Sequence, residues 1–299
     1  MLKSNKLKGF IFSFLSAFLY ALNVLVLKKF LGDISSNELL FLLYMGSTIG
    51  ILLIMLLKNK EKATFKPQKK ELPFISGIVI CDILATILVA ESLKHLNAST
   101  VALLSVLETT ATIIISSIIF KIKINKNLIL SVVFVTLGGI LLSINSALKI
   151  DFSIASILVI LATLLWGIKN NLTAKVSNNN PLLLVFYTCL AVTLFNFLFI
   201  IKDTNIITLI TSHWYLLIIG FFTYGISILF FTYGTNFLGA SKTTIIFSLR
   251  PIFSTILSII IFKEKTNVLF IISLLFMSLG IYFTICDSRK KNNNYRERK

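Results

Sequence analysis

One stretch of this chain occurs twice, and that repetition constrains the fold more than any other feature. Residues 91–123 align without gaps with residues 233–265, at an offset of 142 positions. Both copies carry an Ala-Ser pair near the start and a Phe-Lys-x-Lys end, at 98–99 and 120–123 and at 240–241 and 262–265. A duplication of this kind indicates a fold built from two similar units.

Long apolar runs alternate with short clusters of charge along the whole chain. Of the 299 residues, 56% are hydrophobic and 14% are charged, whereas a soluble domain carries about 25% charge. A helix needs roughly 20 apolar residues to cross the hydrocarbon core of a membrane. On that basis we predict ten spans, at residues 8–28, 37–57, 72–92, 98–120, 126–146, 152–172, 181–201, 213–234, 240–262 and 266–286. A soluble α-helical protein is the alternative, and the low share of charge disfavours it.

The predicted spans divide into two halves, residues 1–146 and residues 152–286. Each half holds five spans, and an odd number forces the second half to lie inverted in the membrane. We therefore predict an all-α membrane protein with ten transmembrane helices arranged as two inverted five-helix repeats, the usual build of secondary transporters. The remaining segment, residues 287–299, is a basic cytoplasmic tail.

The basic residues between the spans predict the orientation. If the N-terminus is inside, most Lys and Arg outside the spans lie in the inner segments, chiefly residues 1–8, 58–71 and 287–299. Cytoplasmic loops carry such an excess. We expect a multi-pass protein of the cell (inner) membrane with both termini in the cytoplasm. The net charge of +17 fits this rule better than it fits nucleic-acid binding.

Charged residues inside the spans are the strongest functional signal. One charge at the centre of a membrane helix costs about 2.5–3.5 kcal/mol on insertion scales. Glu108 and Arg250 both lie near mid-span and occupy the same position of the two repeats. Two interpretations are open: a substrate or proton site that includes both, or a structural salt bridge that holds the halves together. Asp82, in the middle of the third span, is a second candidate with Glu108 for proton coupling.

Polar and aromatic residues at similar depth are candidates for substrate binding. Lys169 can alternatively extend to the membrane surface, as long basic side chains near span ends do. Trp166, like Tyr20 at the equivalent position, can stack on a substrate or simply pack. Together with Arg250, the predicted substrate-binding set is Asn23, Trp166, Lys169, Asn170 and Tyr224, of which Tyr224 is the repeat equivalent of Asp82. Pro251 should kink the ninth span.

Other classes of function have no support in the sequence. We find no Gly-rich nucleotide loop, no metal-ligand cluster and no nucleophile with a base, so we expect neither an enzyme nor a cofactor. The three cysteines lie singly in apolar spans, which disfavours a disulfide scaffold. The expected partners are a small-molecule substrate and the lipid bilayer, without nucleic acid. A homodimer stays open.

Several short motifs in the second half carry a resemblance to a known family. They are Leu165-Trp166-Gly167, Leu238-Gly239-Ala240-Ser241, Arg250-Pro251 and Phe262-Lys263-Glu264. With the two five-span halves, the chain resembles the EamA-type branch of the drug/metabolite transporter superfamily over nearly its whole length. The first half departs from the pattern, because Thr109 stands opposite Pro251 and Ile122 opposite Glu264.

The resemblance implies a transporter that moves small organic metabolites, often outward. We predict a secondary transporter, an exporter of amino acids or related compounds. The alternatives are a metabolite uptake permease and a non-transporting membrane scaffold or sensor. Without an ATP site, transport has to draw on a gradient, and Glu108 and Asp82 are the available proton carriers. Facilitated diffusion, with both carboxylates structural, is the alternative to proton coupling.

Overall fold

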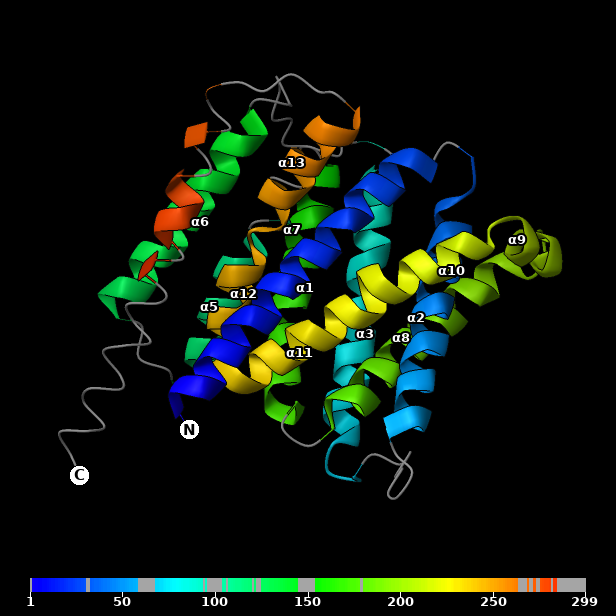
Figure 1. The fold of residues 1–299 in the computed structure, drawn as a ribbon, viewed down its shortest axis with the longest axis horizontal. Helices are drawn as coiled ribbons and strands as arrows, with labels where there is room; N and C mark the ends of the chain where they lie inside the picture. The colour runs from blue at the N-terminus through cyan, green and yellow to red at the C-terminus, as the bar shows by residue number, and fades with distance from the viewer. Residues whose placement is uncertain are drawn as a thin grey trace.

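The chain is all-helical wherever its structure is described. The computed structural model describes residues 2–30, 33–58, 68–93, 95, 104–105, 107–119, 121, 125–144, 154–177, 180–262, 268, 271–272, 275–280 and 282–283. The helices are α1 (Leu2–Phe30), α2 (Ser36–Lys58), α3 (Leu72–Leu93), α5 (Leu107–Ile119), α6 (Lys126–Ile144), α7 (Ile154–Val176), α8 (Pro181–Ile200), α9 (Ile206–Ser212), α10 (Trp214–Gly220), the π-helix η1 (Phe221–Ile226), α11 (Ser227–Leu238), α12 (Ala240–Phe247) and α13 (Arg250–Phe262). None of the described residues forms a strand, which confirms the all-helical part of the predicted fold class (Figure 1).

Several of the helices are suited to a membrane. Five are long and apolar enough to cross it, at Ser36–Leu57, Leu72–Val89, Ile154–Val176, Pro181–Ile200 and Trp214–Leu238. The last of these joins α10, η1 and α11 without a break in the chain of helical residues. Most of the predicted span 266–286, and the start of the span predicted at 98–120, lie outside the described residues. Ten spans therefore remain a prediction.

The two halves pack through two equivalent pairs of helices, each with one helix from either half. Helix α3 packs along α7, and α1 packs along α11. At the repeat offsets, α1 is the counterpart of α7, and α3 is the counterpart of the run from α10 to α11. Exchange of the two halves thus converts the first contact into the second. The second helices of the two halves, α2 and α8, pack on each other, and a Thr48 hydroxyl lies 3.1 Å from that of Thr193.

The span predicted at 240–262 is broken into two helices. Helix α12 ends at Phe247, and α13 begins at Arg250 with Pro251 in its first turn, where a missing N–H breaks no helical hydrogen bond. The Ser248 hydroxyl donates to the Ile245 carbonyl at 2.6 Å, which satisfies a carbonyl at the end of α12. The predicted kink of one helix at Pro251 is therefore wrong, because the span is divided into two helices before the proline and Pro251 begins the second. Arg250 is the first residue of α13, and Glu108 likewise lies in the first turn of α5.

A close crossing of backbones joins α2 to α10. A Cβ atom on Gly46 would overlap the Leu217 carbonyl oxygen, and one on Gly220 would overlap the Leu43 carbonyl oxygen. Only glycine permits this approach. The Ser47 hydroxyl donates to the Gly220 carbonyl at 2.9 Å, at the residue that precedes the π-helix. A π-helix shifts the hydrogen-bond ladder, and side-chain donors of this kind satisfy its carbonyls.

Candidate functional site

A cavity lies between the two halves and collects every site residue that the sequence predicts. Its volume is about 180 Å³, well above the roughly 10–15 Å³ that one buried water requires. The predicted residues that line it are Asn23, Asp82, Glu108, Trp166, Lys169, Asn170, Tyr224 and Arg250. They come from α1, α3, α5, α7, η1 and α13, so the cavity exists only when both halves are folded together.

Asp82 forms the first polar cluster of the cavity. The Lys169 ammonium lies 2.6 Å from Asp82 Oδ1, and the Trp166 indole N–H donates to the same oxygen at 3.3 Å. Both donors are on α7, which packs along the whole of α3. The Lys169 side chain is only 16% exposed and points to a carboxylate that is 3% exposed. The interpretation that Lys169 extends to the membrane surface is therefore wrong, because the buried carboxylate holds the ammonium inside the protein.

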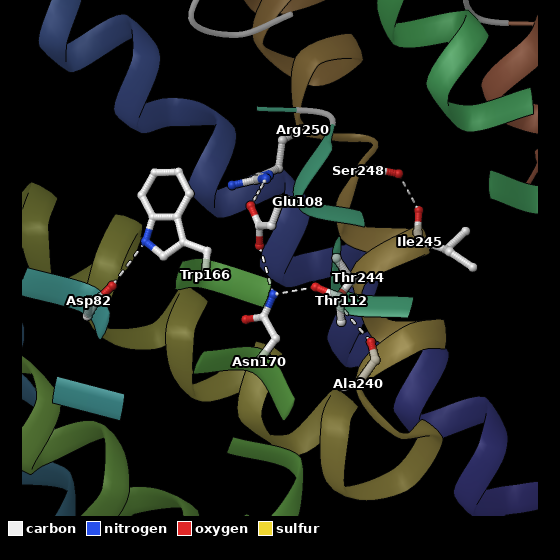
Figure 2. Close-up of polar contacts among 10 residues, drawn as sticks. All are labelled: Asp82, Glu108, Thr112, Trp166, Asn170, Ala240, Thr244, Ile245, Ser248 and Arg250. Atoms are coloured by element: carbon white, nitrogen blue, oxygen red, sulfur yellow. Dashed lines mark hydrogen bonds and ion pairs between the residues drawn. The ribbon is translucent and has the colours of Figure 1, made fainter. Parts of the chain in front are cut away.

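Glu108 and Arg250 form the second polar cluster. Arg250 Nη2 donates to Glu108 Oε2 at 3.0 Å, across the two repeats. The Asn170 amide donates to Glu108 Oε1 at 2.9 Å and is 3.2 Å from the Thr112 hydroxyl (Figure 2). Glu108 lies in the first turn of α5, where the helix dipole favours negative charge. The salt-bridge interpretation is correct in its geometry, and the pair also lines the cavity, so the two interpretations describe the same contact.

Aromatic rings cover the wall between these clusters. The guanidinium carbon of Arg250 lies 4.1 Å from the Phe247 ring centre and 5.1 Å from that of Tyr20. Tyr20 meets Tyr224 edge to face at 5.6 Å, and Tyr224 meets Tyr44 at 4.5 Å. The wall is therefore continuous from the cation of Arg250 to Tyr44. Such faces attract cations and pack against apolar groups.

Two buried oxygen atoms in the cavity wall accept no hydrogen bond from any described residue. They are Asp82 Oδ2 and Asn23 Oδ1. The Asn23 amide nitrogen, in contrast, donates to the Thr223 carbonyl at 3.2 Å. Buried acceptors are normally satisfied, so these enclosed oxygens would gain a hydrogen bond from any donor that reaches them. An ammonium group is such a donor.

Comparison with known proteins identifies the class of molecule to which this cavity belongs. The sequence model of the EamA-like transporter family matches residues 7–144 and again residues 153–286. The chain belongs to the EamA-like transporter family. This family is part of the drug/metabolite transporter superfamily and consists of integral membrane transporters rather than enzymes.

The fold of this EamA-like transporter is also found in solved structures. One, described only as "Crystal structure of protein", matches with a TM-score of 0.79 over 94% of this chain and 98% of the other. The two sequences are 12% identical, so the likeness extends to the fold alone. No curated protein matches the sequence. Among the described residues, no group of His, Cys, Asp and Glu could hold a metal ion.

The cavity of the EamA-like transporter is open at one end. At the end where α2 begins and α3 finishes, its lining includes the exposed Ser36 and the half-buried Val89. At the opposite end, where α7 finishes and α8 begins, the lining residues Thr173, Leu184 and Thr232 are buried. In Figure 1 the end of α1 and the start of α2 lie toward the top of the view.

Sequence reasoning missed several lining residues. Tyr44, Phe231 and Phe247 are buried aromatic residues in apolar helices, and Thr86 and Thr188 are hydroxyl residues in similar runs. A mid-span tyrosine such as Tyr44 is a weak signal, because its hydroxyl needs a partner or water at depth. The phenylalanines carry no such signal, since their sequence context resembles that of any lipid-facing ring.

Proposed function

We propose that this EamA-like transporter is a secondary exporter of amino acids or related compounds that carry both charges. The observation that supports this most directly is the pairing of opposite charges on one cavity wall. Asp82 keeps an oxygen without a described donor, and Arg250 offers a guanidinium that lies over the Phe247 ring. A molecule with an ammonium and a carboxylate matches both, and its apolar body would pack on the tyrosines between them.

We further propose ten spans in two inverted repeats, residues 1–146 and 152–286, with both termini in the cytoplasm. The exchange of α3–α7 for α1–α11 contacts supports a two-fold relation between the halves. With this topology, the open end of the cavity faces outside the cell. Single cysteines at Asn59 and Thr204, in a chain without the native three, test the orientation. An impermeant thiol reagent on intact cells should label Thr204→Cys and spare Asn59→Cys, and the reverse labelling would overturn it.

We propose that protons drive this transport through Asp82 and Glu108. The free oxygen of Asp82 can hold either a proton or the ammonium of the cargo, but not both. A carboxylate that takes a proton outside and releases it inside would thereby exchange inward protons for outward cargo. Rocking of the two repeats around the cavity would expose it to each side in turn.

Transport by purified protein tests both the substrate class and the coupling. Metabolite profiling of cells with and without the protein selects the cargo. The cargo is then supplied to liposomes that contain the purified protein and carry an imposed pH gradient. Wild type should accumulate it against its own gradient, while Asp82→Asn and Glu108→Gln should exchange cargo without accumulation. Glu38→Gln is the matched control, because that carboxylate lies outside the cavity on Ser35 and Thr204.

Each alternative predicts a different result in the same assays. An uptake permease would deplete the cargo from cells that lack the protein, and a scaffold would move nothing in liposomes. Flux that ignores the pH gradient and only equilibrates the cargo would indicate facilitated diffusion, with both carboxylates structural.

A further inference from the structure

We infer that Lys169 is a built-in counter-ion that occupies the cation position of Asp82, so that the carrier needs no inorganic cation there. The inference deepens the proposed function, since it concerns how the same cavity is kept neutral. It predicts that sodium and potassium play no part at this carboxylate in the wild-type protein. Its test measures cation binding and does not depend on transport.

The contact between the two groups is short and enclosed. Lys169 Nζ lies 2.6 Å from Asp82 Oδ1, at the distance of a charge-assisted hydrogen bond. The Trp166 N–H lies on the same oxygen at 3.3 Å. Two donors therefore occupy Oδ1, while Oδ2 has none among the described residues. The ammonium neutralises the carboxylate and still leaves one oxygen for a proton or a cargo amine.

A buried carboxylate that stays ionised needs a positive partner, which can be a basic side chain or a small metal cation. Carboxylate oxygens suit hard cations. With Lys169 in place, an inorganic cation at Asp82 would face like-charge repulsion in a medium that screens poorly, whereas a cargo with both charges brings a carboxylate that offsets its ammonium. Without Lys169, the same oxygens would attract sodium or another small cation from the cavity.

The other repeat supports this assignment. At the equivalent positions, Asn23 stands in place of Lys169 and Tyr224 in place of Asp82. Both charges are thus missing together, and an amide and a phenol remain in the same cavity. A lysine that served to bind cargo alone would not need to be matched with the aspartate.

Thermal unfolding of the purified full-length protein tests the inference. Wild type should melt at the same temperature in the chloride salts of sodium, potassium and N-methylglucamine at equal ionic strength and alkaline pH. Lys169→Gln should melt lower in N-methylglucamine and rise by about 2–4 °C in sodium, as expected for a cation that binds only the folded state. Lys169→Arg should behave as wild type.

The double variant Asp82→Asn/Lys169→Gln is the matched control, because it removes both charges and should not respond to sodium. A sodium-specific shift in wild type would overturn the inference, since the position would then be open to metal. So would a Lys169→Gln protein that melts alike in all three salts, or that fails to fold in all of them, because no cation would then replace the lysine. Loss of transport in any variant bears on the proposed function and leaves this result unaffected.

Discussion

Two clusters at equivalent positions of the repeats face the same cavity with different chemistry. The charged cluster consists of Asp82, Trp166 and Lys169, and the neutral cluster of Tyr224, Tyr20 and Asn23. The first is held by an ion pair of 2.6 Å, the second by an amide hydrogen bond of 3.2 Å to a carbonyl and by ring contacts. The comparison shows that a chain of two repeats can carry a one-sided site, in which only one repeat contributes a carboxylate at this position.

The largest difference in stability between the two clusters should appear when Lys169 and its equivalent Asn23 are replaced. Lys169→Met should lower the free energy of unfolding by about 3–5 kcal/mol, because it leaves the buried Asp82 charge without its partner. Asn23→Leu, at the equivalent position, removes one hydrogen bond and should cost about 0.5–1.5 kcal/mol. Chemical denaturation in detergent measures both. Equal losses would mean that the two clusters contribute alike.

Loss of one partner of the Glu108–Arg250 ion pair should cost less stability than loss of Lys169. Glu108→Ala and Arg250→Ala should each cost about 3 kcal/mol, because Glu108 keeps the Asn170 amide when Arg250 is lost. The double variant should recover part of that loss, since no unpaired charge remains. Folded yield and melting temperature report the result, and simple addition of the two losses would show the residues to be independent.

A smaller loss of stability is expected at the glycine crossing of α2 and α10. Gly46→Ala places a methyl group on the Leu217 carbonyl and should cost about 1–3 kcal/mol through overpacking. Gly77→Ala is the control, because its new Cβ would lie 3.0 Å from Leu172 Cδ1, the end of a flexible side chain. Melting temperatures should fall for the first and change little for the second. A similar fall for both would contradict the close crossing of α2 and α10.

The smallest effect is expected where the two halves meet symmetrically. Thr48→Val removes a hydroxyl that lies 3.1 Å from Thr193, and should cost no more than about 1 kcal/mol. Thr48→Val/Thr193→Val should be nearly neutral, since no buried hydroxyl is left without its counterpart. A loss for the double variant equal to the sum of the two single losses would show that the two hydroxyls contribute independently.

The sequence predicted the site better than it predicted its contacts. Repeat alignment and the cost of charge in a membrane singled out Glu108 and Arg250, and their pairing follows from their equivalent positions. Lys169 was ambiguous, because its direction depends on how α7 is turned against α3, a contact between segments far apart in the chain. The sequence around Asp82 did not indicate that its ion-pair partner is Lys169.

The regular parts of the fold were also predictable, and the irregular parts were not. Apolar length and the basic segments placed most helices to within a few residues. The π-helix at Phe221–Ile226 has no such signal, and the crossing with α2 at Gly46 and Gly220 directly before it joins segments far apart in the chain. Likewise, Pro251 indicated a kink, but the break before it depends on local hydrogen bonds such as that of Ser248.

The glycine crossing of α2 and α10 also bears on how easily the molecule can move. Where helices interdigitate, a new crossing angle requires side chains to leave one set of grooves and enter another, so the interface tends to hold one of a few positions. Gly46 packs on the Leu217 backbone and Gly220 on the Leu43 backbone, too close for any Cβ atom. Because the Ser47 hydroxyl also binds the Gly220 carbonyl, we expect α2 and α10 to keep this crossing and to move as one unit when the two halves rock.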